Sequence, residues 1–91
     1  MSIIKIPTPL RQYTDQNEYV KANGKTIKDV MEDLVKKHPN LKKHLYNEEN
    51  TLRNFVNIYL NNEDVRTMNG VKTSVEDNDV IFIVPAVAGG L

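Results

Sequence analysis

Apolar residues recur with two different periods along this chain, and the periods predict its strands and helices. Residues 3–6 form a short β-rich run that stops at Pro7, because proline has no N–H to donate to a sheet. Residues 18–22 form a second extended run, which ends in the turn-favouring pair Asn23-Gly24. We expect these two runs to be adjacent antiparallel strands.

The next segment has the period of an α-helix. Thr26 is a residue type that caps helix N-termini, and Pro39 cannot continue a helix. Basic residues directly before Pro39 suit the negative end of the helix dipole. The segment therefore predicts one amphipathic helix, whose apolar stripe consists of Ile27, Val30, Met31, Leu34 and Val35.

The second half of the chain contains further strand signals. We expect a helical turn around residues 41–46, then a loop, and then strands at residues 55–60 and 80–84 with a brief strand at 65–66 between them. The order β-β-α-β-(β)-β predicts an α+β fold with one main helix packed on one face of a mixed sheet of four to five strands. This order fits the ubiquitin-like β-grasp, in which the first and last strands lie side by side.

Alternation along the last strands predicts two apolar faces, although one helix can cover only one of them. The covered face is expected to hold Val56, Ile58, Leu60, Ile81 and Ile83. The other face would form an exposed patch that leads to the end of the chain and docks a partner. We call this predicted set the outer patch: Phe55, Tyr59, Phe82 and Val84. Two alternatives would remove it, namely a loop at residues 47–53 that folds over it, or a register shifted by one residue.

Composition narrows the function classes. The chain has 91 residues, which suit one domain, and its 12 basic and 12 acidic side chains cancel, so no global field favours nucleic acid or membrane. It has no cysteine, and neither a membrane-span-length apolar run nor a signal-peptide layout is present. We therefore expect a cytoplasmic protein that is monomeric when free. His38 and His44 each follow a lysine pair and are interpreted as solvated surface rather than metal ligands; the lysines could form a basic edge that steers an acidic partner or, less favoured, RNA.

The segment after the last predicted strand has an unusual composition. Residues 1–84 are expected to form the folded domain and residues 85–91 a flexible tail. The tail begins with Pro85, Ala86, Val87 and Ala88, and its Gly89-Gly90 pair lacks Cβ atoms, so it could enter a narrow cleft in a partner. An extended tail would reach roughly 20 Å to Gly90. The alternative interpretation is an ordinary frayed terminus.

Two segments carry a family resemblance. Residues 55–66, with the sequence FVNIYLNNEDVR, and residues 85–90, with the sequence PAVAGG, resemble the MoaD/ThiS family of ubiquitin-like sulfur carriers, and within it the CysO-type carriers of cysteine biosynthesis. The resemblance covers nearly the whole chain. It implies that the protein is not an enzyme but a carrier on which partner enzymes act.

The resemblance also implies a chemistry for Gly90. An adenylating enzyme related to ubiquitin activators would join Gly90 to AMP with ATP and magnesium, and sulfide or a persulfide would then give a thiocarboxylate. A pyridoxal-phosphate-dependent synthase would accept the sulfur, and a JAMM-type zinc peptidase would release the product. ATP, magnesium, zinc and pyridoxal phosphate would belong to these partners, and no cofactor would be bound by this chain.

Leu91 departs from the family pattern, in which mature carriers end at the second glycine. It would lock the Gly90 carbonyl in an amide, so we expect a peptidase, namely the JAMM enzyme, to cut between Gly90 and Leu91; the alternative is a residue left by cloning. Other functions remain open at this point. They are a carrier for molybdopterin or thiamine synthesis, a ubiquitin-like modifier conjugated through Gly90, and an interaction domain with an inert tail.

Overall fold

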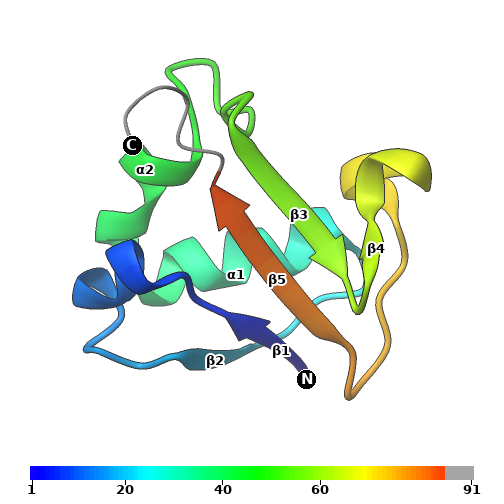
Figure 1. Cartoon of the computed structure of the whole chain (residues 1–91), viewed down its shortest axis with the longest axis horizontal. Coiled ribbons are helices and arrows are strands. Elements are labelled where there is room, and N and C mark those ends of the chain that lie inside the picture. Colours follow the sequence, from blue (N-terminus) through cyan, green and yellow to red (C-terminus); the bar gives the residue numbers. More distant parts are fainter. Residues whose placement is uncertain (86–91) are drawn as a thin grey trace.

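The computed structural model describes residues 1–85, in which five strands form a single mixed sheet with one long helix across it (Figure 1). The strands lie in the order β2-β1-β5-β3-β4. Their bounds are β1 Ser2–Lys5, β2 Tyr19–Ala22, β3 Val56–Leu60, β4 Glu63–Asp64 and β5 Val80–Pro85. The helices are α1 Ile27–Lys37 and the short α2 Lys42–Leu45, and 3-10 turns occupy Thr8–Tyr13, Pro39–Leu41, Val65–Thr67 and Gly70–Lys72.

The pairing of the strands confirms the predicted β-grasp. β1 pairs antiparallel with β2, and Ile4 lies opposite Val20. β1 also pairs parallel with β5, which places the first and last strands side by side. β5 pairs antiparallel with β3 on its other edge, so it is the central strand of the sheet. The first half of β5 is therefore paired on both edges, whereas Ile83, Val84 and Pro85 at its end pair with β3 alone.

Helix α1 begins and ends where the sequence predicts. The Thr26 hydroxyl accepts a hydrogen bond from the Asp29 N–H at 3.2 Å, which caps the first turn. At the other end the His38 N–H donates to the Leu34 carbonyl before Pro39 stops the helix. Four residues of the predicted stripe are buried and Val35 is half-buried against them; the buried ones are Ile27, Val30, Met31 and Leu34.

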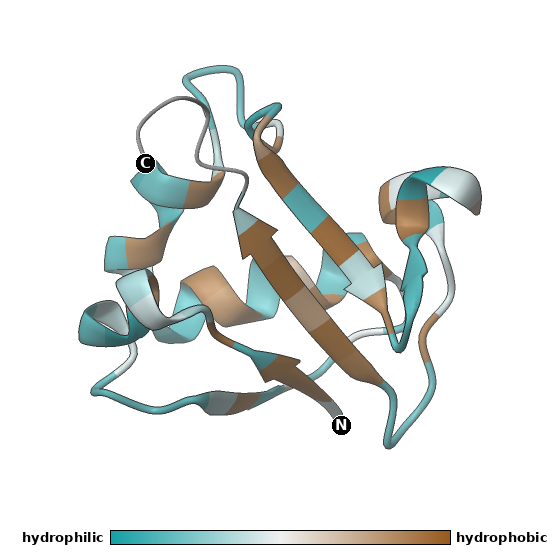
Figure 2. Ribbon diagram, in the orientation of Figure 1, coloured by the Kyte–Doolittle hydropathy of each residue, from teal (hydrophilic) through white to brown (hydrophobic). Residues whose placement is uncertain are grey.

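The strands around the core alternate as expected. The residues of β3 and β5 assigned to the covered face are all buried, and they are Val56, Ile58, Leu60, Ile81 and Ile83. Figure 2 shows β5 hydrophobic along its length up to its C-terminal tip, whereas β3 alternates. A central strand that is apolar on both faces buries one face under α1 and presents the other outward.

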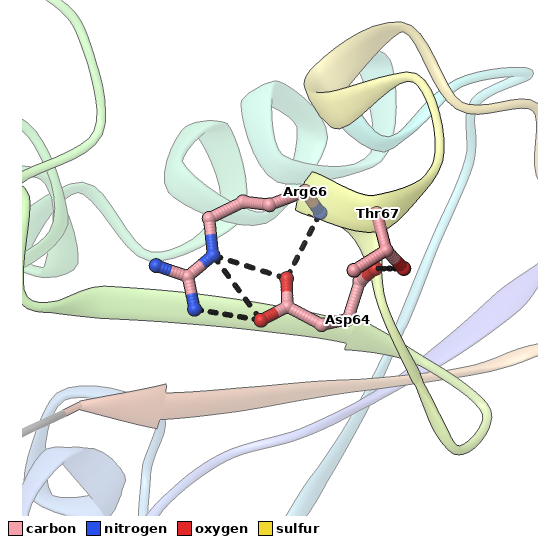
Figure 3. A network of polar contacts seen from close by, with 3 residues as sticks. All are labelled: Asp64, Arg66 and Thr67. Carbon is pink, nitrogen blue, oxygen red and sulfur yellow. Dashed lines mark hydrogen bonds and ion pairs between the residues drawn. The ribbon is translucent and has the colours of Figure 1, made fainter.

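The prediction of a brief strand at residues 65–66 is wrong. β4 lies two residues earlier, at Glu63–Asp64, because Asn61 adopts φ 57° and makes a tight turn that brings Glu63 opposite Leu60. The Asp64 carboxylate then accepts from the Arg66 N–H at 2.9 Å and starts a 3-10 turn at Val65. Figure 3 shows the Arg66 guanidinium folded back on the same carboxylate. Local capping by Asp64 therefore ends the strand.

Asp33 of α1 makes contacts whose contribution to the stability of the fold should depend on pH. Its carboxylate accepts from the Asn23 N–H at 2.8 Å and pairs with Lys37 Nζ at 3.1 Å, and these contacts hold the pKa of Asp33 below its usual value. A lowered pKa contributes stability that is present at neutral pH and is lost as the pH falls below about 4. Asp33→Asn should therefore be less stable at neutral pH and lose less stability on acidification, as measured by urea unfolding.

The Asp33→Asn variant should still lose some stability on acidification. Asp64 and Asp77 also have lowered pKa values, because Arg66 and the chain's N-terminal ammonium donate to them, and they keep part of the acid sensitivity. An unchanged difference in unfolding free energy between neutral pH and about pH 3 would contradict the role of Asp33.

Candidate functional site

The outer face of β3 and β5 brings three of the four predicted patch residues together. Tyr59 and Phe82 lie directly opposite each other in the register, and Val84 is the next outward residue of β5. The three side chains line one shallow hollow of about 360 Å³, together with Asn61 and Asn62. Val84 is 43% exposed, and Tyr59 and Phe82 are half-buried. This apolar surface stands beside the end of the central strand.

Phe55 does not join this group. It was expected to continue the alternation of β3, but the strand begins at Val56, and the Val56 N–H donates to the Arg53 carbonyl in a turn. The turn sends the Phe55 side chain, which is 44% exposed, to a different hollow that Pro85 also lines. From here on, "outer patch" denotes Tyr59, Phe82 and Val84.

Neither alternative for the outer patch is what the structure shows. The loop at residues 47–53 lies on the helix side, where Leu52 packs against the core and lines a hollow with Met31 and Val71. The register is also as predicted, since Ile58 and Ile81 point into the core. The loop therefore leaves Tyr59, Phe82 and Val84 uncovered.

Charged groups frame the outer patch on both sides. Lys5 of β1 lies opposite Phe82, and its ammonium is 6.0 Å from the centroid of the Phe82 ring. On the β4 side, Arg66 Nη2 lies 2.6 Å from the Asp64 carboxylate, and Asp64 faces Tyr59 in the register (Figure 3). Arg66 lowers the pKa of Asp64, so this pair stays ionised at neutral pH. The sequence analysis did not include Lys5 among the residues around the outer patch. Its outward position in a strand expected next to the last strand could have indicated it.

The two histidines differ from the predicted solvated surface. Both are half-buried, and His44 stacks on Tyr13 with the ring centroids 4.4 Å apart. Its Nε2 is buried without a hydrogen-bond partner within residues 1–85. In the same part of the chain, no group of three or more His, Cys, Asp or Glu side chains is placed to hold a metal ion. His44 is thus a packing residue at the side of the sheet.

Replacing His44 by phenylalanine is expected to stabilise the fold. The ring would keep its stack on Tyr13, and the change would remove a buried polar atom that lacks a protein partner, a defect that costs about 1–3 kcal/mol. We expect a gain of about 1 kcal/mol in the free energy of unfolding, measured with urea. His44→Gln is the matched control, because it loses the ring and keeps a polar group, and it should be destabilised. A clear loss of stability in His44→Phe would contradict this description.

Of the remaining predicted site residues, Pro85 alone lies in the described part of the chain. Pro85 is the last residue of β5 and lies opposite Val56. Ala86, Val87, Ala88, Gly89, Gly90 and Leu91, which hold the expected threading, adenylation and processing sites, are not among the described residues. Within residues 1–85, no helix combines the length and the hydropathy needed to cross a membrane.

Comparison with known proteins gives consistent matches over nearly the whole chain. The sequence pattern of the ThiS family matches residues 4–90. The chain is 40% identical over 89 residues to the sulfur carrier protein CysO of Mycobacterium tuberculosis, a match that covers 96% of each chain. Among solved structures it is similar to a chain of the Amycolatopsis orientalis BexX/CysO complex, with a TM-score of 0.88, 40% identity and coverage of 99% of this chain and 100% of that one. It is also similar to the small archaeal modifier protein 1 of Methanosarcina acetivorans, with a TM-score of 0.85, 28% identity and coverage of 98% and 95%.

Proposed function

This chain belongs to the ThiS family, and on that premise we propose that it carries sulfur as a thiocarboxylate on Gly90. It is a carrier protein on which partner enzymes act, not an enzyme. One structural observation supports the proposal most. The central strand β5 carries Phe82 and Val84 of the outer patch and finishes at Pro85, five residues before Gly90, so an enzyme that holds Gly90 would lie close to this apolar surface.

The chemistry begins with activation of the Gly90 carboxylate. A carboxylate is a poor electrophile, because oxide is a very poor leaving group. In the active site of an adenylating enzyme, a carboxylate oxygen attacks the α-phosphorus of ATP, pyrophosphate leaves, and an acyl-adenylate forms. Sulfide sulfur then attacks the acyl carbon and AMP leaves with the bonding electron pair. The product is a Gly90 thiocarboxylate, and magnesium and ATP belong to the partner.

The composition of the tail suits entry into such an active site. Gly89 and Gly90 carry no Cβ, and residues 86–88 are small and apolar, so the extended segment is slim. Its reach from Pro85 to Gly90 is at most roughly 20 Å. The enzyme that activates Gly90 must therefore come close to the surface around Pro85, and we assign the outer patch as its docking face.

The sulfur acceptor is inferred from the relatives. The resemblance to CysO-type carriers of cysteine biosynthesis leads us to propose cysteine or related amino-acid synthesis; the 40% identity to a sulfur carrier protein CysO supports the carrier role, and the matched CysO structure is a complex with BexX. We assign the acceptor as a pyridoxal-phosphate-dependent synthase and the releasing enzyme as a JAMM-type zinc peptidase. Both cofactors would sit in these partners.

Leu91 must be removed before any of these steps, because it holds the Gly90 carbonyl in an amide. A peptidase, which we assign as the JAMM-type enzyme, would hydrolyse the Gly90–Leu91 bond and free the carboxylate. Intact mass spectrometry tests this step on protein exposed to its native cell extract. Loss of the mass of one leucine residue is expected, and persistence of the leucine-terminated form in active cells would contradict it.

A second candidate function is protein modification, which the similarity to the small archaeal modifier protein 1 favours. In that case the activated Gly90 carbonyl would be attacked by a lysine amine of a target protein, giving an isopeptide bond. Lysine-linked conjugates on a blot of cells that express the tagged chain would support the modifier. A thiocarboxylate on the trimmed chain without such conjugates would support the carrier.

A further inference from the structure

A groove lies at the root of the tail, beyond the end of the sheet. It encloses about 370 Å³, and Pro85 forms part of its wall. Figure 1 places α2 beside the C-terminal end of β5, and α2 supplies Lys43 and His44 to the groove. The opposite walls come from the Thr8–Tyr13 turn, through Leu10, and from the turn that holds Phe55. We call this hollow the tail-root groove; it is separate from the hollow of the outer patch.

The rim of the tail-root groove carries two cations that lack acidic partners in the described structure. Arg53 Nε donates to the Lys43 carbonyl at 3.1 Å, which fixes the guanidinium beside the Lys43 backbone. The ion pairs found within residues 1–85 involve neither Lys43 nor Arg53. Both residues also line the adjoining hollow of about 540 Å³, where Lys42 adds a third cation and Glu48 is the acidic side chain among the lining residues. In a chain with no net charge, this rim is locally positive.

The floor of the tail-root groove is apolar. Phe55 is 44% exposed in it, and Leu10 and Val56 lie against the core beside it. Covering an exposed aromatic ring with a partner's apolar side chain is favourable, and carboxylates beside that side chain would complement the rim. An acidic segment with an adjacent apolar residue therefore matches both the shape and the charge of the groove.

The position of the groove identifies which protein would supply this segment. Gly90 is within roughly 20 Å of Pro85 along an extended chain, so a protein that holds Gly90 must cover the surroundings of Pro85. The outer patch flanks Pro85 through Val84, and the tail-root groove begins at Pro85 itself. We infer that the groove docks an acidic segment of the enzyme that activates Gly90, with carboxylates on Lys43 and Arg53 and an apolar side chain against Phe55. This inference rests on the proposed function for the identity of the partner.

The test is direct binding of the chain that ends at Gly90 to its adenylating enzyme, by calorimetry without ATP. The charge-reversed variant Lys43→Glu/Arg53→Glu is expected to bind more weakly, with a Kd raised at least about tenfold. Its binding should also depend less on salt concentration. The matched control Lys25→Glu/Lys28→Glu makes the same change in net charge at exposed positions before and within the first turn of α1, outside the groove. It should bind almost like the unaltered chain.

A milder variant distinguishes loss of the binding charges from misfolding. Lys43→Gln/Arg53→Gln removes both charges without reversing them, and it should weaken binding less than the charge-reversed variant while unfolding in urea like the unaltered chain. Equal binding of all forms, equal weakening by the control, or no binding by the unaltered chain would each overturn the groove as a docking site. Pyrophosphate exchange, measured separately, reports on the proposed function. Binding that depends on Lys43 and Arg53 without exchange would leave the groove standing and contradict the adenylation chemistry.

Discussion

A chain that ends at Gly90 is expected to form an acyl-adenylate with its activating enzyme, whereas the chain that ends at Leu91 is expected to form none. The reason is chemical: attack on ATP needs a free carboxylate oxygen, and Leu91 leaves an amide at that place. The measurement is exchange of labelled pyrophosphate into ATP with each form at equal concentration. Exchange should depend on the Gly90-ended chain and should be at background with the Leu91-ended chain.

Two further forms make this experiment specific. Gly89→Val in the Gly90-ended chain adds a branched side chain next to the reacting group, and it should block exchange if the tail enters a narrow cleft. Ala86→Ser changes a small residue for another small residue farther from Gly90, and it should be tolerated. Equal exchange by the Gly90-ended and Leu91-ended chains would contradict the requirement for processing.

Neighbouring residues of β5 are expected to separate stability from partner binding. Ile81 is fully buried under α1, and Ile81→Ala should cost about 2–5 kcal/mol of unfolding free energy, a large share of the 5–15 kcal/mol typical of a small domain. Phe82 faces outward between Tyr59 and Lys5, so Phe82→Ala should cost less stability. It should instead weaken binding to the activating enzyme by on the order of thirtyfold, as loss of an aromatic anchor commonly does.

Urea unfolding and calorimetry on both variants provide the measurements. Ile81→Ala should bind normally at temperatures where it remains folded, because its side chain contacts no surface that a partner can reach. A Phe82→Ala variant that binds like the unaltered chain would contradict the outer patch as a docking face. A Phe82→Ala variant as unstable as Ile81→Ala would show that Phe82 is a core residue.

Elements whose signals are local could be predicted from the sequence. Thr26 and Pro39 bound α1 because a cap and a chain break act on the residues next to them. Alternation along β3 and β5 identified the core face and placed Tyr59, Phe82 and Val84 on the other. These features depend on residues within one element and on the period of its backbone.

The predictions that were wrong failed because of turns, caps and tertiary contacts, which the alternation of apolar residues and the composition do not reveal. The turn at Arg53 delays the start of β3 and sends Phe55 away from the outer patch, and the cap at Asp64 replaces the expected strand by a 3-10 turn. His44 is covered by Tyr13, a contact between segments that only the tertiary fold brings together. The tail-root groove could not be predicted from the sequence for the same reason, since it is assembled from the first 3-10 turn, α2 and the end of β5.

The thiocarboxylate itself is the most direct test of the sulfur-carrier role. The Gly90-ended chain would be incubated with its activating enzyme, ATP, magnesium and sulfide, and its intact mass would then be measured. The expected result is a mass increase equal to the replacement of one oxygen by sulfur, which fragmentation places on Gly90. If ATP is consumed to AMP while the mass of the chain stays unchanged, Gly90 does not carry sulfur and the proposed function is contradicted.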